Sequence, residues 1–237
     1  MKNIFCAIDT KDLSSAEDMV RKLKNASVNF KLGLEFFSAH GIAGVEKIRA
    51  AAGDKAEIFL DLKFHDIPNT VAGAVKSVLS AKPQFLTVHA SGGMEMMKAA
   101  VQAAGGKVKI LAVTVLTSLD GETLESVGQS TSVSAQVLRL ARLAKESGAA
   151  GAVCSPHEIE MLKKEMGKDF LLVVPGIRPA GSDKGDQKRT MTPEEAFRLG
   201  ADYLVVGRPI TEAADPLLAV QSLLGALPVK ALSNINE

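Results

Sequence analysis

Tryptophan is absent from this 237-residue sequence, and tyrosine occurs once. Aromatic residues make up only 4% of a chain that is 46% hydrophobic, so the core must be built mainly from Val, Ile, Leu and Ala. An excess of charge of one sign is also lacking, because the formal net charge is +1. Such a chain has no broad electrostatic footprint for nucleic acid or anionic membrane, and we expect neither as a partner.

Cysteines and long hydrophobic runs are scarce as well. Cys6 and Cys154 lie far apart and form neither a CxxC motif nor a disulfide framework, which fits a reducing compartment. The longest uncharged apolar stretch, ILAVTVLTSL at 110–119, is about half a membrane span. The apolar run near the N-terminus is too short for the core of a signal peptide. These features predict a cytoplasmic protein.

Short β-rich runs alternate with helical patterns along the chain. The strand candidates lie at 3–8, 28–34, 56–62, 84–90, 107–116, 150–155, 170–176 and 202–207. Helical stretches lie between them, for example at 14–25, 69–81, 133–148 and 192–200. This α/β alternation predicts a single-domain (β/α)8 TIM barrel over residues 1–237. The rival, a doubly wound open sheet, is disfavoured because AIDTKDLSS, and no GxGxxG, follows the first strand.

Polar side chains occur where each predicted strand ends. They are Asp9, Lys31, Asp61, Lys63, His89, Thr117, Ser118, Ser155, Arg178 and Arg208. In a TIM barrel the carboxyl ends of the strands form one rim, and catalytic residues come from that rim. We therefore expect the functional site there.

The densest group of charges lies in DLKFHDIPNT at 61–70. Asp61 and Lys63 are two residues apart on a strand, so their side chains share one face, and Lys31 from the neighbouring strand can join them. Asp66 lies past the strand and could return over the same rim. Such an array offers an ammonium group for a developing carbanion and then a proton donor. A structural cluster of ion pairs is the alternative.

A metal site is another interpretation of Asp9, Asp61, His65 and Asp66. The interleaved lysines would compete for these carboxylates, and the His/Cys spacing typical of zinc is absent. The sequence therefore favours lysine and carboxylate chemistry without a metal.

The last third of the chain is typical of an anion site. The segment PGIRPAGSDKGDQKRTMTP at 175–193 has no large apolar residue over 180–190, and a polar loop of this length is commonly a lid or binding loop. Gly207 and Arg208 follow the last strand, where Gly lets backbone N–H groups approach a phosphate and Arg binds two of its oxygens. The alternative is a surface loop and an ordinary turn. The residues alone predict a barrel enzyme with a small phosphorylated substrate.

The motifs together resemble the orotidine 5′-phosphate decarboxylase family, whose members form UMP and CO2 from orotidine 5′-monophosphate. The matching segments are AIDT (7–10), FKLGLEFF (30–37), DLKFHDIPNT (61–70), VTVLTS (113–118), PGIRP (175–179) and VVGRPIT (205–211). They span nearly the whole chain in the family's order, and DLKFHDIPNT is highly specific. The spacing is similar to the bacterial form.

The resemblance implies a role for each matching residue. Lys63 would be the general acid that protonates C6 after CO2 leaves; Asp61 would sit beside the substrate carboxylate, with Lys31 holding it and the ribose. Asp66 and Thr70 would reach the site of the neighbouring subunit, which implies a homodimer. The other implied substrate contacts are Asp9 for the ribose, Thr117 and Ser118 for the pyrimidine, and Arg178, Gln187, Gly207 and Arg208 for the phosphate.

The family mechanism needs no cofactor. Loss of CO2 leaves a carbanion at C6 whose lone pair lies in the ring plane, so its stabilisation must be electrostatic. Two other functions stay open: a Mg2+-dependent sugar-phosphate decarboxylase or aldolase of the same superfamily, and a non-catalytic nucleotide-binding barrel. HDIPNT after Lys63 and LTS after the fifth strand favour the orotidine reaction over the first. The intact set of Lys31, Asp61, Lys63 and Asp66 argues against the second.

Overall fold

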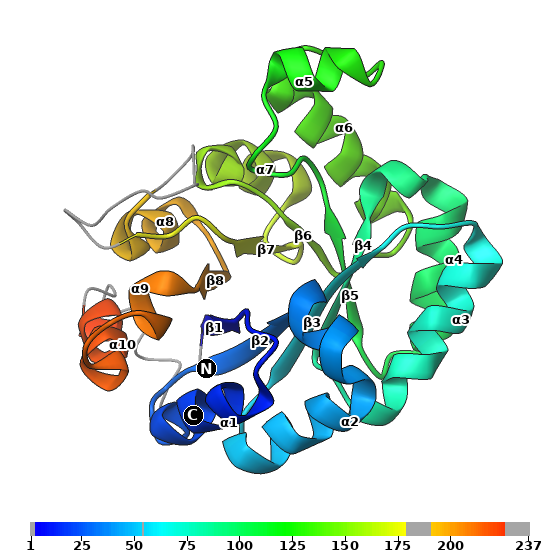
Figure 1. The fold of residues 1–237 in the computed structure, drawn as a ribbon. Helices are drawn as coiled ribbons and strands as arrows, with labels where there is room; N and C mark the ends of the chain where they lie inside the picture. Colours follow the sequence, from blue (N-terminus) through cyan, green and yellow to red (C-terminus); the bar gives the residue numbers. More distant parts are fainter. Residues whose placement is uncertain (1–2, 54, 179–190, 226–237) are drawn as a thin grey trace.

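Eight parallel strands form a closed barrel in the computed structural model, which describes residues 3–53, 55–178 and 191–225 (Figure 1). Each strand pairs with the next one in the sequence, and β1 closes the barrel by pairing with β8. The strands are β1 (Ile4–Ile8), β2 (Asn29–Gly33), β3 (Ile58–Phe64), β4 (Phe85–His89), β5 (Lys109–Val113), β6 (Gly151–Val153), β7 (Leu171–Val174) and β8 (Tyr203–Val206). The predicted TIM barrel is confirmed.

The strand boundaries differ most from the prediction at β3 and β5. The run predicted at 107–116 ends as a strand at Val113, and Val115 and Leu116 turn into a cavity at the end of the barrel. Conversely, β3 continues past the predicted end at residue 62 to Phe64. Both differences lie at the carboxyl ends of strands, where an apolar run does not show whether its last residues stay in the sheet.

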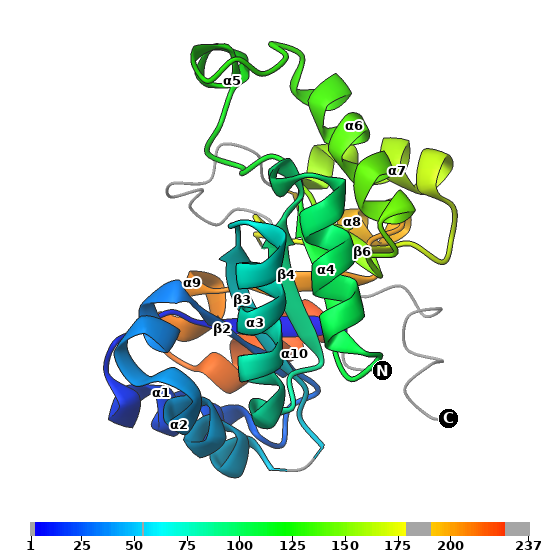
Figure 2. The same ribbon diagram turned by 90° about the vertical axis from the view of Figure 1, so that its right-hand side faces the viewer.

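Helices surround the barrel, and α3 and α4 lie side by side on one flank (Figures 1 and 2). They are α1 (Leu13–Leu23), α2 (Leu34–Ala52), α3 (Pro68–Val78), α4 (Met94–Ala104), α5 (Gly121–Ser126), α6 (Val133–Glu146), α7 (Ile159–Met166), α8 (Pro193–Leu199), α9 (Arg208–Thr211) and α10 (Pro216–Gly225), with short 3-10 turns η1 (Leu79–Ala81), η2 (Ala90–Gly92) and η3 (Pro156–Glu158). Within the described part of the chain, no helix has the length and apolar character that a bilayer crossing needs.

Capping residues explain where several of these helices begin. The Asp12 carboxylate accepts hydrogen bonds from the backbone of Ser14 and Ser15 at the start of α1. Thr192 accepts from the backbone of Glu195 at the start of α8, and Pro193 occupies its first turn, as the sequence TPEE predicts. These local signals set the helices that follow the strands.

The alternating side chains of the strands pack into two separate apolar clusters. The cluster inside the barrel contains Phe5, Ala7, Phe59, Phe85, Leu111, Val173, Tyr203 and Val205. Its rings Phe5, Phe59 and Phe85 meet edge to face, with centroids 5.5, 5.7 and 6.0 Å apart. The other cluster lies between strands and helices. Several of the few aromatic residues therefore fill the barrel and close it beneath the carboxyl ends of the strands.

Candidate active site

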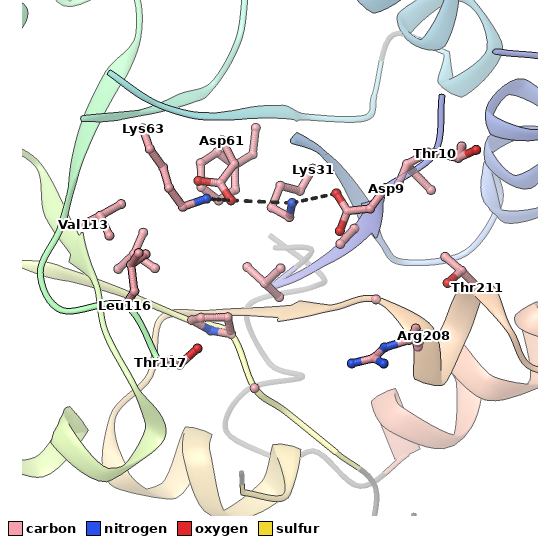
Figure 3. A pocket seen from close by; sticks show the side chains of 18 of the residues that line it. Asp9, Thr10, Lys31, Asp61, Lys63, Val113, Leu116, Thr117, Arg208 and Thr211 are labelled. Carbon is pink, nitrogen blue, oxygen red and sulfur yellow. Dashed lines mark hydrogen bonds and ion pairs between the residues drawn. The ribbon is translucent and has the colours of Figure 1, made fainter. Parts of the chain in front are cut away.

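A cavity of about 600 Å3 opens at the carboxyl ends of the strands (Figure 3). Phe59 and Val205 belong both to the inner apolar cluster and to the cavity lining, so that cluster forms the cavity floor. The polar lining residues stand above this floor, on β2 and β3 and on the segments that follow β1, β5, β7 and β8. The predicted location of the site at this rim matches the position of this cavity.

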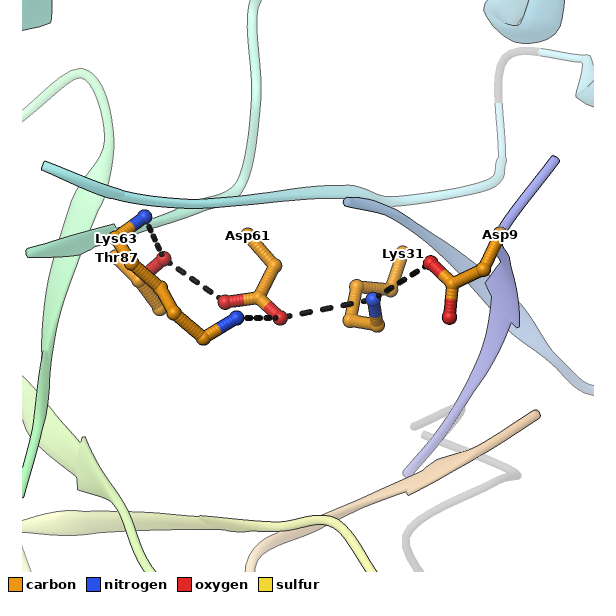
Figure 4. A network of polar contacts seen from close by, with 5 residues as sticks. All are labelled: Asp9, Lys31, Asp61, Lys63 and Thr87. Carbon is orange, nitrogen blue, oxygen red and sulfur yellow. Dashed lines mark hydrogen bonds and ion pairs between the residues drawn. The ribbon is translucent and has the colours of Figure 1, made fainter. Parts of the chain in front are cut away.

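Four charged side chains form a row across the cavity, with carboxylates and ammonium groups alternating (Figures 3 and 4). Lys31 Nζ lies 3.2 Å from Asp9 Oδ1 and 3.5 Å from Asp61 Oδ2. Lys63 Nζ lies 2.8 Å from the same Asp61 oxygen. The side chains of Lys31 and Asp61 are 9% and 13% exposed, whereas that of Asp9 is 55% exposed. The two central charges are thus the most shielded from water and interact most strongly.

Gly33 at the end of β2 makes room for this row. A Cβ at Gly33 would lie 2.8 Å from Asp9 Oδ1 and 3.2 Å from Lys31 Nζ. A side chain at this position would therefore force Asp9 or Lys31 to shift from the present ion-pair geometry. The sequence analysis quoted this glycine within FKLGLEFF but assigned it no role.

The backbone of β3 is irregular where it presents Lys63. Asp61 and Lys63 both face the cavity, as the strand period predicts. Lys63, however, has a φ of +49°, in the left-handed region, and the pairing of β3 with β4 shifts register between Leu60 and Phe64. A lysine in this conformation costs about 1–3 kcal/mol and persists only where its surroundings hold it. No sequence pattern signals such a conformation at a lysine.

Thr87 of β4 connects the carboxylate to this irregular backbone (Figure 4). Its hydroxyl donates to Asp61 Oδ1 at 2.9 Å and accepts from the backbone N–H of Lys63 at 2.9 Å. The side chain is fully buried and does not line the cavity. The sequence analysis missed it; the available signal was a hydroxyl residue in the otherwise apolar strand run FLTV at 85–88.

The surroundings of Asp61 favour its ionised form. Burial opposes ionisation, but the ammonium groups of Lys31 and Lys63, with hydrogen bonds from Lys63 and Thr87, hold the pKa of Asp61 below its ordinary value of 3.8. The cavity therefore contains a carboxylate that is charged at neutral pH and fixed on both oxygens.

Most of the predicted site residues meet in this cavity. Those that line it are Asp9, Lys31, Asp61, Lys63, Thr117, Arg178, Gly207 and Arg208. Arg208 lies across the cavity from Lys63, near Thr211 (Figure 3). The site thus has a lysine and carboxylate end and a separate arginine end.

Other predicted residues lie elsewhere in this chain. Ser118, Asp66 and Thr70 are exposed and do not line the cavity. Of the polar strand ends, His89 is also outside the lining, and Ser155 is fully buried, where it caps η3. Gln187 lies outside the described residues.

The residues considered for a metal site do not gather. Among residues 3–53, 55–178 and 191–225, no three His, Cys, Asp or Glu side chains are grouped so that they could hold a metal ion. His65 instead lies against His89, with ring centroids 5.7 Å apart.

Comparisons with known proteins match the whole barrel. A model of the family described as "Orotidine 5'-phosphate decarboxylase / HUMPS family" matches residues 2–223. Proteins named orotidine 5'-phosphate decarboxylase from Anaeromyxobacter sp. (strain K) and Paramagnetospirillum magneticum are 50% and 52% identical; the matches cover 95% and 90% of this chain and 98% and 93% of theirs. The crystal structure of orotidine 5'-phosphate decarboxylase from Lactobacillus acidophilus has a TM-score of 0.82 at 38% identity, covering 94% of this chain and 97% of that one.

The charged row makes a prediction for stability against pH. The folded pKa of Asp61 lies below its unfolded value, so ionised Asp61 stabilises the fold at neutral pH, and this contribution is lost as the pH falls through the folded pKa. We expect Asp61→Asn to lower the free energy of unfolding by about 1–3 kcal/mol at pH 7. The difference in free energy of unfolding between wild type and Asp61→Asn, measured by urea titration, should become smaller below about pH 4. Asp18→Asn, which changes an exposed ion pair with Arg21, is the control. If the difference in free energy of unfolding between wild type and Asp61→Asn stays constant down to about pH 3, the lowered pKa assigned to Asp61 is contradicted.

Proposed function

The chain belongs to the orotidine 5′-phosphate decarboxylase / HUMPS family, and we propose that it converts orotidine 5′-monophosphate to UMP and CO2, the last step of de novo pyrimidine nucleotide synthesis. The observation that carries this proposal is the row of alternating charges along one side of the cavity, with Arg208 on the other side. Decarboxylation of this substrate needs a fixed cation at the carbon that loses CO2 and a separate grip on the phosphate. The cavity supplies side chains of both kinds.

Lys63 is the proposed acid. When the bond between C6 and the carboxyl carbon breaks, the electron pair stays on C6 in the ring plane, where the π system cannot delocalise it. The ammonium group of Lys63 stabilises this charge and then transfers a proton from Nζ to C6. Its support is its position, with Nζ 2.8 Å from a carboxylate that is itself fixed in the cavity.

Asp61 and Lys31 complete the reacting end. Asp61 lies beside the substrate carboxylate and holds Lys63 in place, while Lys31 bridges Asp61 and Asp9. The ribose hydroxyl groups then contact Lys31 and Asp9, which is the more exposed end of the row. Because these charges are positioned before substrate arrives, little reorganisation accompanies the reaction.

The proposed phosphate site lies across the cavity from Lys63, whereas Thr117, the proposed contact for the base, lies away from Arg208 (Figure 3). Arg178, Gly207 and Arg208 bind the phosphate, since a guanidinium group donates two parallel hydrogen bonds to phosphate oxygens. Gln187, outside the described residues, joins them by the family resemblance. Thr117 in the lining, with Ser118 beside it, recognises the pyrimidine. Phosphate binding far from C6 supplies binding energy that appears in the chemical step.

A homodimer is part of the proposal, with Asp66 and Thr70 contributing to the neighbouring site. Every residue from His65 to Thr70 is exposed, and the apolar side chain of Ile67 is 67% exposed. Asp66 and Thr70 do not reach the cavity of their own chain. An exposed apolar residue between two polar residues of this kind is what a second copy of the chain would cover.

A direct assay tests the proposed reaction. The protein is incubated with orotidine 5′-monophosphate in EDTA, and the ultraviolet absorbance change is followed. We expect turnover without added metal. A requirement for Mg2+ would instead favour a sugar-phosphate decarboxylase or aldolase of the same superfamily, and UMP binding without turnover would favour a non-catalytic nucleotide-binding barrel.

Lys63→Ala should lower kcat by at least about 10³-fold, because it removes both the stabilising charge and the proton. Circular dichroism should show that the fold persists. Lys109→Ala, at the other end of the barrel, is the matched control and should turn over like wild type. Near-normal activity of Lys63→Ala would refute the role of Lys63.

Arg208→Ala should lower kcat/KM on orotidine 5′-monophosphate by about ten- to a hundredfold, which corresponds to the loss of charge-assisted hydrogen bonds. Activity on orotidine itself, which has no phosphate, serves as the control and should change little. An equal loss on both substrates would mean that Arg208 does not grip the phosphate.

Mixing inactive variants tests the shared sites. A dimer of one Lys63→Ala chain and one Asp66→Ala chain keeps one intact site if Asp66 serves the partner. After the two variants are unfolded together and refolded, about a quarter of wild-type activity should return, since half of the dimers are mixed. Lys63→Ala mixed with Lys31→Ala, whose changes lie in the same chain's cavity, should recover nothing. If the mixture of Lys63→Ala and Asp66→Ala regains no activity, the contribution of Asp66 to the partner's site is contradicted.

A further inference from the structure

Thr87 is fully buried, and its hydroxyl group bonds to both Asp61 and Lys63. Its neighbours on β4, Phe85 and Leu86, are apolar and belong to the two hydrophobic clusters. The single hydroxyl group at this position therefore faces Asp61 and Lys63 from behind, where substrate does not reach.

The Thr87 hydroxyl group determines which oxygen of Asp61 contacts each of its partners. Thr87 donates to Oδ1, so Oδ2 is left facing Lys63 Nζ at 2.8 Å and Lys31 Nζ at 3.5 Å. Without this donor, a buried carboxylate oxygen would lose a hydrogen bond, and the carboxylate could rotate about its bond to Cβ. One hydroxyl thus fixes the plane of the carboxylate.

The same oxygen also fixes the backbone that carries Lys63. It accepts the Lys63 N–H where the pairing of β3 and β4 shifts register and where Lys63 adopts its left-handed conformation. A strained residue keeps such a conformation only when its surroundings specify it, and an unpaired buried N–H group is costly. Thr87 provides that acceptor.

We propose that Thr87 is a positioning residue for decarboxylation, whose hydroxyl group holds the Asp61 carboxylate and the Lys63 backbone in the one arrangement that presents the ammonium group to C6. The role rests on the proposed function. It differs from that of a buried threonine that serves only the fold. Thr114 is such a threonine: its hydroxyl donates to the Val153 carbonyl at 3.1 Å, and it does not line the cavity.

The test compares Thr87→Val, which keeps the shape but loses the hydroxyl, with Thr87→Ser, which keeps the hydroxyl. We expect Thr87→Val to lower kcat for orotidine 5′-monophosphate by about ten- to a hundredfold, as for loss of hydrogen bonds to a charged group. KM and the dissociation constant of UMP should stay within about threefold, because Thr87 does not touch the ligand. Thr87→Ser should restore kcat to within about threefold of wild type.

A pH profile separates positioning from a loss of stability. The hydrogen bond from Thr87 contributes to the lowered pKa of Asp61, so the acid limb of kcat should move to higher pH in Thr87→Val and return in Thr87→Ser. Thr114→Val is the matched control: it also removes a buried hydroxyl, and it should leave kcat and the acid limb unchanged.

Each outcome decides the proposal. Equal kcat values for Thr87→Val and Thr114→Val, or a Thr87→Ser as slow as Thr87→Val, would overturn the role of Thr87. If Thr87→Val does not fold, Thr87→Cys replaces it, since a thiol is a weaker hydrogen-bond donor and acceptor than a hydroxyl group. Absence of turnover from wild type would overturn the proposed function, and this role with it. Turnover of wild type with an unimpaired Thr87→Val would overturn this role alone.

Discussion

The Asp61 carboxylate between two ammonium groups is the interaction on which the site depends. A charge in a shielded position is unfavourable unless it is paired and hydrogen-bonded. Asp61 meets this requirement with Lys31 and Lys63 on one oxygen and Thr87 on the other. Lys63 in turn pairs with Asp61, and Lys31 pairs with both Asp61 and Asp9. The row therefore holds together as a unit, and loss of any central member leaves an uncompensated charge in the cavity.

The barrel makes such a row possible by separating apolar and charged layers. Inward side chains of β3 run from Phe59 in the apolar floor to Asp61 and Lys63 above it. The floor excludes water from below, which strengthens interactions between the charges just above it. Arg178 follows β7, and Arg208, at the start of α9 after β8, lies across the cavity from Lys63 (Figure 3). In the proposed function, phosphate binding and chemistry therefore fall to different elements, so that phosphate binding leaves the lysines in place.

The sequence was sufficient for the barrel and for most of the charged row, because both follow from short-range rules. Alternation of strand-like and helical segments predicts the fold, and the two-residue spacing of Asp61 and Lys63 predicts their common face. Gly33 and Thr87 escaped assignment because their roles come from the register between neighbouring strands. Gly33 matters through the space it leaves for Asp9, and Thr87 through the shift between β3 and β4. A pattern along one strand contains neither relation.

The left-handed backbone at Lys63 links stability to the proposed chemistry. Leu62 packs into the outer cluster before it, and Phe64 packs against that cluster after it. The N–H of Lys63 bonds to Thr87 and its Nζ to Asp61. Because four separate contacts specify one lysine, its ammonium group is in place before any substrate binds. The conformational cost at this residue is met during folding, and the reaction itself then requires no rearrangement of the cation that stabilises the carbanion.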